Sequence, residues 1–186
     1  MRRSTTSRTR HQIHIRRCRV VDIPRLLDLW KRASAGPSVS DNPDAIRRRL
    51  HRDRHLFLLA WDEKRLVGSL IGGWDGWRAS MYRLAVDPDY RRRGIARRLV
   101  TAVENELREI GATRIGALVF TYNRSGQAFW SSESYSLDEE VARYVKDLGD
   151  ASGSRRSRTG SRAVAGLRTD GSWFRSQFPR RSSHRK

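Results

Sequence analysis

The chain of 186 residues is 37% hydrophobic, contains a single cysteine and carries a formal net charge of +19. This length suits one domain with additional segments, and the absence of any apolar run of about 18 residues argues against a membrane-spanning helix. One cysteine cannot form an internal disulfide and fits a reducing, cytoplasmic compartment, and the sequence around it suggests no metal site.

The positive charge is concentrated at the two ends of the sequence. Residues 1–19 contain seven arginines and no acidic residue, and residues 149–186 contain nine arginines, one lysine and two aspartates. Residues 20–148 are nearly balanced, with 22 basic and 18 acidic side chains. We therefore expect a disordered basic leader over 1–11, a folded domain over 12–148 and a disordered tail beyond it.

The tail, 149–186, is rich in Ser, Arg and Gly and has too few large apolar side chains to form a core. Three interpretations stay open. The tail binds RNA or another acidic surface through counterion release, with its aromatic side chains stacking on bases. Alternatively it is a solvated tail without a role. Finally, translation of a GC-rich gene past its natural end would give this composition, which the 35 arginines against 4 lysines favour.

The first part of the central domain combines one strand with two helices. Residues 13–19 alternate as a strand does. In 21–33 the apolar residues recur on one helical face, and Asp22 is the expected N-cap. A loop over 36–42 leads to a shorter helix over 43–51, which begins with proline.

The second part of the domain is richer in strands. Strands are predicted over 56–61, 65–73 and 78–86, and Asp75-Gly76 is a strong signal for a hairpin turn between the last two. A main helix is predicted over 95–110. The remaining predicted elements are a strand, a helix and a last strand, over 114–121, 125–133 and 141–148.

The stretch from 84 to 99 carries the most information about function. A strand ends at Asp87, and a helix begins at Gly94. The first N–H groups of a helix have no intrahelical partner, and together with the helix dipole they favour an anion. Gly94 has no Cβ to keep a ligand away, and Ala96 leaves the first turn unobstructed. Cations suited to phosphate surround this turn: Arg91, Arg92, Arg93, Arg97 and Arg98.

Two interpretations of this turn compete. It binds a phosphate group through its backbone, or it is a helix flanked by solvated arginines. The spacing of its glycines fits neither a P-loop nor the dinucleotide-binding motif.

A second pattern begins at Asn123, about thirty residues later. Asn123 follows a predicted strand and is placed to cap the next helix. Phe129 and Trp130 are consecutive in that helix, so one can face the core while the other borders a ligand channel. Plain core packing is the alternative for Phe129. The pattern ends at Ser134-Tyr135.

Together these motifs resemble the GNAT superfamily of N-acetyltransferases. The residues Arg91, Gly94 and Ala96 are similar to its coenzyme A pyrophosphate loop, Gln/Arg-x-x-Gly-x-Gly/Ala, and Asn123 to Tyr135 is similar to its second signature. The resemblance covers roughly 13–148. It implies an α/β GNAT fold, in which helices flank both faces of a mixed central sheet. It also implies that acetyl-CoA donates an acetyl group directly to a primary amine, without an acyl-enzyme.

The resemblance implies where acetyl-CoA binds. Pantetheine would lie along the edge of the strand that ends at Val86, and a backbone N–H near that residue would polarise the thioester carbonyl. Backbone N–H groups from Arg92 to Arg97 would hold the pyrophosphate. The full implied set is Leu84, Ala85, Val86, Arg91, Arg92, Arg93, Gly94, Ile95, Ala96, Arg97, Asn123, Phe129 and Trp130.

The chain departs from the superfamily pattern where acid–base chemistry is expected. Trp130 stands where many relatives have a tyrosine that serves as the general acid, and an indole N–H is a poor proton donor at neutral pH. Ser134 stands where a glycine is usual, so strain is expected in that turn. Tyr82 and Asp41 are the candidates for the general base, and proton transfer through solvent is the alternative.

The sequence does not identify the acceptor. The loop over 36–41 and the hairpin over 137–140 are expected to shape its site. The carboxylates of Asp41, Glu139 and Glu140 would favour a cationic acceptor, a small amine or a peptide or protein amine, unless they are merely solvated. A monomer or a homodimer is expected.

Two alternatives to an acetyltransferase remain. A basic nucleic-acid-binding protein would use its arginines on phosphodiesters and would leave both motifs as coincidences. A GNAT domain that binds coenzyme A without turnover would account for Trp130 and Ser134.

Overall fold

The computed structural model describes residues 12–36, 38–146 and 148. The predictions of a disordered leader and a disordered tail fall on residues outside this set. The strands are β1 (Ile13–Arg17), β2 (Phe57–Asp62), β3 (Arg65–Trp74), β4 (Ala79–Val86) and β5 (Ile115–Ala117). The α-helices are α1 (Ile23–Arg32), α2 (Pro43–Asp53), α3 (Ile95–Glu109) and α4 (Arg124–Ser132). Short 3-10 helices are η1 (Val20–Asp22), η2 (Arg54–Leu56) and η3 (Pro88–Tyr90).

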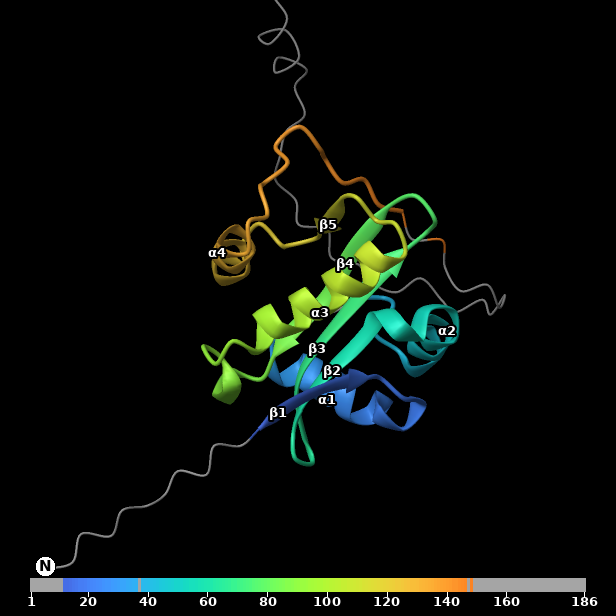
Figure 1. The fold of residues 1–186 in the computed structure, drawn as a ribbon, viewed down its shortest axis with the longest axis vertical. Helices are drawn as coiled ribbons and strands as arrows, with labels where there is room; N and C mark the ends of the chain where they lie inside the picture. Colours follow the sequence, from blue (N-terminus) through green and yellow to red (C-terminus); the bar gives the residue numbers. More distant parts are fainter. Residues whose placement is uncertain (1–11, 37, 147, 149–186) are drawn as a thin grey trace, which may run out of the picture. The chain divides into compact units, whose positions relative to one another are not determined.

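The strands form a single mixed sheet in the order β1-β2-β3-β4-β5 (Figure 1). The first four strands pair antiparallel with their neighbours, and β4 pairs parallel with β5. This mixed sheet confirms the expected α/β fold class. The parallel pairing requires a crossover, which α3 provides between β4 and β5.

The sheet separates two hydrophobic clusters, one beneath each layer of helices. On β2, Phe57, Leu59 and Trp61 join the cluster formed with α1 and α2. The alternate residues Leu58 and Ala60 join the cluster formed with α3 and α4. All six residues of β2 are buried because helices cover both faces of the sheet.

Two glycines let α3 lie close to the middle strand. A Cβ on Gly68 would be 3.0 Å from Ile95 Cγ2, and one on Gly72 would be 2.6 Å from Val103 Cγ1. Both glycines share a face of β3 with Leu70, which is buried against α3. Because this close approach fixes α3 against β3, it also fixes the N-terminal turn of α3 near the end of β4.

Strand β4 contains a bulge at Arg83. Ser69 pairs with Ala85 and Ile71 with Tyr82, so β4 has one residue more than β3 over this stretch. Arg83 has φ +55°, the left-handed conformation common in bulges. The extra residue changes which side chains face α3. Before it, Met81 faces α3; after it, Leu84 does.

The prediction of a last strand over 141–148 is wrong for the residues described there. The chain divides into two compact units, Met1–Asp138 and Glu139–Lys186, and every element above belongs to the first. In the second unit, 141–146 and 148 have no regular structure, and their apolar side chains are largely exposed. Tyr144 and Val145 are adjacent rather than alternating, so a strand there would not bury one apolar face.

The predicted strand over 114–121 is also shorter than expected. Only Ile115–Ala117 pairs, opposite Ala79–Met81 of β4. Pairing stops just before the β4 bulge begins, and beyond it Leu118 and Phe120 are about half exposed. The pairing of β4 with β5 therefore ends at Met81 and Ala117.

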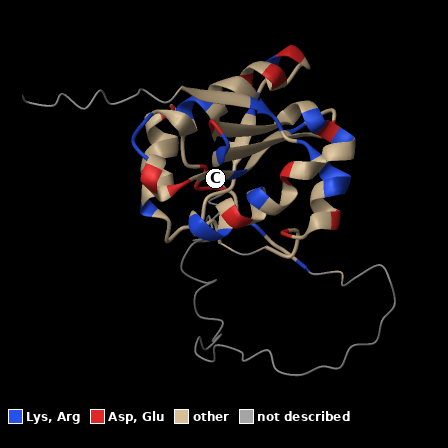
Figure 2. Cartoon of the chain, turned by 90° about the horizontal axis from the view of Figure 1, so that it is seen from below, with Lys and Arg blue, Asp and Glu red and all other residues tan. Residues whose placement is uncertain are grey.

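The described domain carries charges of both signs. In Figure 2 basic and acidic residues are interspersed along the cartoon of the described residues. Several arginines are paired within the domain, for example Arg16 with Asp22 and Arg17 with Glu106.

Candidate active site

The turn between β4 and α3 has the geometry of an anion-binding site. Arg92 and Gly94 have positive φ angles of 61° and 73°, and α3 begins at Ile95. Within the described residues, no backbone N–H from Arg92 to Arg97 donates a hydrogen bond. A Cβ on Gly94 would meet nothing within 4 Å. These donors consequently have no acceptor among the described residues, and they lie at the positive end of a helix dipole.

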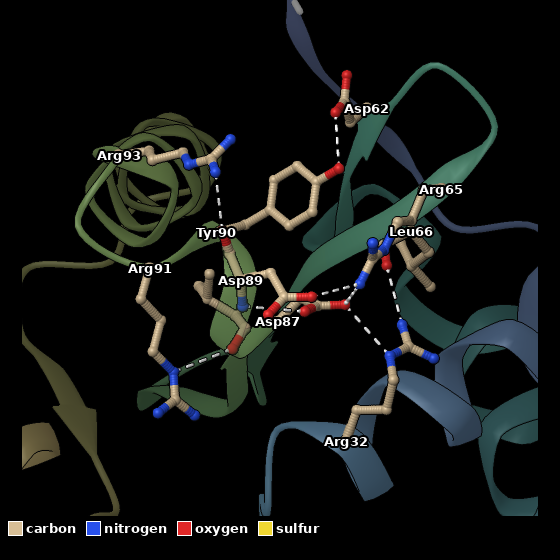
Figure 3. A network of polar contacts seen from close by, with 10 residues as sticks. Arg32, Asp62, Arg65, Leu66, Asp87, Asp89, Tyr90, Arg91 and Arg93 are labelled. Atoms are coloured by element: carbon tan, nitrogen blue, oxygen red, sulfur yellow. Dashed lines mark hydrogen bonds and ion pairs between the residues drawn. The ribbon is translucent and has the colours of Figure 1, made fainter.

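Asp87, which follows β4, anchors this turn through a network of hydrogen bonds and ion pairs (Figure 3). Its carboxylate accepts hydrogen bonds from Arg32 Nε at 3.2 Å, from Arg65 Nη2 at 3.1 Å and from the Asp89 N–H at 3.2 Å. The side chain is only 2% exposed. Burial disfavours the ionised carboxylate, but the three donors outweigh burial and lower the pKa of Asp87 below its ordinary value.

Tyr90 extends the network toward the β2–β3 hairpin. Its hydroxyl donates to Asp62 Oδ2 at 2.8 Å, and this bond raises the pKa of Tyr90. The guanidinium groups of Arg65 and Arg93 lie over its ring, at 5.1 and 4.7 Å from the centroid. Figure 3 shows the Tyr90 hydroxyl directed at Asp62, so Tyr90 ties the turn to the end of β2.

Most arginines of the turn are engaged with the protein itself. Arg91 donates to Val86 O and Ala33 O, Arg93 to Asp89 O, and Arg98 to Ile13 O. Arg97 pairs with Glu133 at 2.9 Å. In the part of the chain that the structure describes, Arg92 alone among the five predicted cations makes no polar side-chain contact. The turn's capacity to hold an anion therefore lies first in its backbone.

The edge of β4 that faces β5 is free along its last residues. The Asp87 N–H donates to Val67 O at 2.9 Å, on the β3 side. Because successive peptide groups of a strand point to opposite edges, the N–H of Val86 points to the β5 side. The pairing with β5 ends at Met81, so among the described residues no strand lies opposite this donor.

The second motif has the local structure predicted for it. Asn123 caps α4, and its side chain accepts from the Gly126 N–H at 2.9 Å. Trp130 is buried and Phe129 is half-buried, so both rings pack against the α3 face of the sheet. Ser134 has φ +67°, which confirms the expected strain of a serine at a position suited to glycine.

The two candidate general bases lie on the α1–α2 side of β4. Asp41 is ion-paired with Arg83 and accepts from the Ser38 N–H at 3.0 Å. Tyr82 is 43% exposed, and its ring lies against Gly73. Asp41 thus holds its own loop, whereas the Tyr82 side chain reaches solvent.

Two other side chains, Tyr135 and Cys18, are unsuited to act as a general acid or as a nucleophile. The Tyr135 hydroxyl donates to Glu104 Oε1 at 2.8 Å, and burial together with this bond raises the Tyr135 pKa far above its ordinary value. Cys18 is buried just beyond the end of β1. Desolvation, reinforced by the nearby Asp22 carboxylate, raises the pKa of its thiol to about 12, so it is no nucleophile at neutral pH.

Sequence reasoning missed Asp87 and Arg83. Asp87 looks like a solvated residue at the end of a strand, because its partners Arg32 and Arg65 are distant in sequence. The bulge at Arg83 did leave a signal. The apolar alternation through Met81 changes phase by one residue before Leu84 and Val86.

The described residues contain neither a metal-binding cluster nor a membrane-spanning helix. No group of three or more His, Cys, Asp or Glu side chains there is arranged to hold a metal ion. Among those same residues, no helix has the length and apolarity to cross a membrane.

Comparisons with known proteins identify relatives of this chain. Residues 23–132 match the acetyltransferase (GNAT) family. An acetyltransferase from Sodalis glossinidius is 34% identical over 136 residues, covering 73% of this chain and 96% of that protein. One from Pectobacterium atrosepticum is 38% identical over 107 residues, covering 58% and 76%.

Solved structures share the fold at lower identity. Ard1 from Thermoplasma volcanium superposes with a TM-score of 0.62 at 19% identity, covering 68% of this chain and 84% of that one. The PaiA N-acetyltransferase from Thermoplasma acidophilum, solved with coenzyme A, gives 0.59 at 18%, covering 66% and 88%. The family match spans more than half of this chain, and nearly the whole Sodalis relative is aligned. This chain therefore belongs to the GNAT family and is an N-acetyltransferase.

Proposed function

We propose that the protein transfers an acetyl group from acetyl-CoA directly to a primary amine. The observation that carries the proposal is the continuity of two features. Among the described residues, the edge of β4 at Val86 has no strand partner, and it leads into a turn whose backbone N–H groups, from Arg92 to Arg97, have no protein acceptor. A strand edge suits an extended amide-bearing arm, and the turn suits a pyrophosphate.

The residues of this turn fit the donor substrate. An anion above Gly94 would accept bonds from backbone donors that have no protein acceptor, and a Cβ at Gly94 meets nothing within 4 Å. The free edge of β4 would place Leu84, Ala85 and Val86 along the pantetheine arm. Phe129 and Trp130 would be apolar neighbours of that arm. Acetyl-CoA, when bound, supplies an acetyl group activated as a thioester.

The chain's own contribution to transfer is electrostatic and positional. Negative charge that develops on the carbonyl oxygen would be stabilised by the Val86 N–H, which is fixed by the neighbouring bond from Asp87 to Val67. A preorganised donor of this kind contributes about 3–4 kcal/mol in other enzymes. The acceptor nitrogen forms the new C–N bond as the C–S bond breaks, without covalent attachment to Cys18.

Proton transfers are assigned mainly to solvent. Trp130 cannot serve as an acid, and the Tyr135 hydroxyl is bound to Glu104. Tyr82 is the better-placed of the two candidate bases, because it is half-exposed and the Asp41 carboxylate is held by Arg83. Water would protonate the departing thiolate.

A primary amine is the acceptor class that the relationship supports. Structural neighbours include an aminoglycoside 6'-N-acetyltransferase from Acinetobacter haemolyticus, a 17% identical protein with a TM-score of 0.60. The nucleic-acid alternative has less support, because the described domain mixes charges of both signs (Figure 2) and uses several arginines internally.

Titration calorimetry of acetyl-CoA into the full chain tests the donor site. We expect a dissociation constant of about micromolar order. Gly94→Glu places a carboxylate in the open space above the turn, at a residue with positive φ, and should weaken binding at least about tenfold. Gly76→Glu is a matched control, because Gly76 also has positive φ and open space but lies in the hairpin turn.

Binding of acetyl-CoA to Gly94→Glu as tightly as to the parent would place the donor elsewhere. A parent chain that binds acetyl-CoA but acetylates no amine in a panel of small amines and peptides would favour the non-catalytic alternative.

A further inference from the structure

The bulge of β4 is held through the main chain of Arg83. The buried Ser69 hydroxyl donates to Arg83 O at 3.0 Å and accepts from Trp30 Nε1 at 2.9 Å. An arginine in the left-handed conformation is strained by about 1–3 kcal/mol, so it persists only where its surroundings fix it. This buried relay from α1 is one such restraint.

The side chain of Arg83 supplies a second restraint. It is 14% exposed and lies over the Trp30 ring, 5.1 Å from the centroid. Its guanidinium donates to Ala35 O at 2.7 Å and to Gly36 O at 2.6 Å, and it also pairs with Asp41. One side chain therefore holds both ends of the described α1–α2 loop.

The same loop also contacts the chain segment that follows β5. A Cβ on Gly36 would be 2.8 Å from Phe120 Cε2, so the loop packs on the segment that follows β5. Arg83 and Phe120 lie on the two chain segments that separate beyond Met81 and Ala117. The loop thus bridges the opening beside the free edge of β4.

We propose that Arg83 is a positioning residue that couples the acceptor-side loop to the bulge that aims the edge of β4 at the thioester. This role rests on the proposed acetyl transfer. Arg83 itself would not contact the reacting atoms. Its backbone sets the direction of the following N–H groups at Leu84 and Val86. Its side chain sets the position of the loop that borders the incoming amine.

Two substitutions separate the backbone role from the side-chain role. Arg83→Gly removes the side chain but adopts φ +55° without strain, so the bulge should persist while the loop loosens. Arg83→Gln removes the contacts and keeps the strain, so both should loosen. Arg48→Gln, at an exposed position of α2, is the matched control.

Hydrogen–deuterium exchange on the full chains without ligand measures the loop. We expect exchange in the peptides covering 38–42 to rise about tenfold in both Arg83 variants and to stay unchanged in Arg48→Gln.

The carbonyl infrared band of bound [1-13C]acetyl-CoA measures the bulge. Its shift from the free-solution frequency should persist in Arg83→Gly and shrink in Arg83→Gln. Affinity for coenzyme A should stay within about twofold in Arg83→Gly, because the bulge persists there and the turn after Asp87 is untouched.

Parent-like exchange in both variants would overturn the loop coupling, and an undiminished band shift in Arg83→Gln would overturn the coupling to the bulge. If neither variant folds, Asp41→Asn removes only the ionic partner, and unchanged loop exchange there would equally contradict the proposal. Failure of the parent to bind acetyl-CoA would instead reject the proposed donor site, and the ligand-free exchange result would still stand.

Discussion

At the scale of single residues, the site depends on a buried carboxylate more than on its exposed cations. The arginines around the turn suggested side-chain recognition of phosphate, but four of the five contact the protein. Gly94 and the capping role of Asn123 were predictable, because backbone conformation and capping are local properties. The role of Asp87 was not, because it arises from partners 22 and 55 residues away.

Asp87→Asn should therefore weaken both the fold and donor binding. An amide keeps the shape but gives up the ion pairs to Arg32 and Arg65, at a cost of about 1–3 kcal/mol in the free energy of unfolding. The turn should loosen, so we also expect acetyl-CoA to bind several-fold more weakly by calorimetry. Asp89→Asn is the control. That side chain is 73% exposed and pairs only with Arg65, so urea unfolding should change by less than about 1 kcal/mol.

Equal effects of the two substitutions would contradict the anchoring role of Asp87. A loss of stability without any loss of acetyl-CoA affinity would confine that role to folding.

At the scale of elements, sequence periodicity predicted most helices and strands to within a few residues. The amphipathic faces of α1 and α3 and the hairpin at Asp75-Gly76 are local patterns, and the structure confirms them. The short β5 depends instead on where the neighbouring strand bulges. The position of this bulge depends on the hydrogen bond from the Ser69 hydroxyl to Arg83 O, which joins residues of different strands.

The close packing of α3 on β3 predicts a size limit at Gly72. Its Cβ would lie 2.6 Å from Val103 Cγ1, so Gly72→Ala should lower the free energy of unfolding by about 1–3 kcal/mol. Val103→Ala removes the clashing methyl groups, so the double variant should recover part of the loss, which denaturant unfolding would reveal. Gly116→Ala is the control, because a Cβ there would only touch Ala79 O at 4.0 Å. Strictly additive losses for Gly72→Ala and Val103→Ala would contradict the packing argument.

At the scale of the whole molecule, two buried carboxylates tie the sheet to α1. Asp22 accepts from Arg16 at 2.7 Å and from the Arg19 N–H at 2.8 Å, where the chain passes from β1 toward α1. Asp87 joins the end of β4 to Arg32 of the same helix. Burial opposes ionisation in both, and the hydrogen bonds and ion pairs prevail, so both pKa values lie below the ordinary aspartate value.

These two shifts fix the direction of acid sensitivity. A carboxylate whose pKa is lower in the folded state binds fewer protons there than when unfolded, so its stabilisation is complete above the unfolded pKa of about 3.9. That stabilisation is lost as the pH falls from there through the folded pKa. We therefore expect the urea midpoint to depend little on these groups near neutral pH and to fall steeply below about pH 4. The Asp22→Asn, Asp87→Asn double variant should start less stable and lose less over the acidic range, because its amides do not titrate. An acid dependence as steep in that variant as in the parent would move the acid sensitivity to other carboxylates.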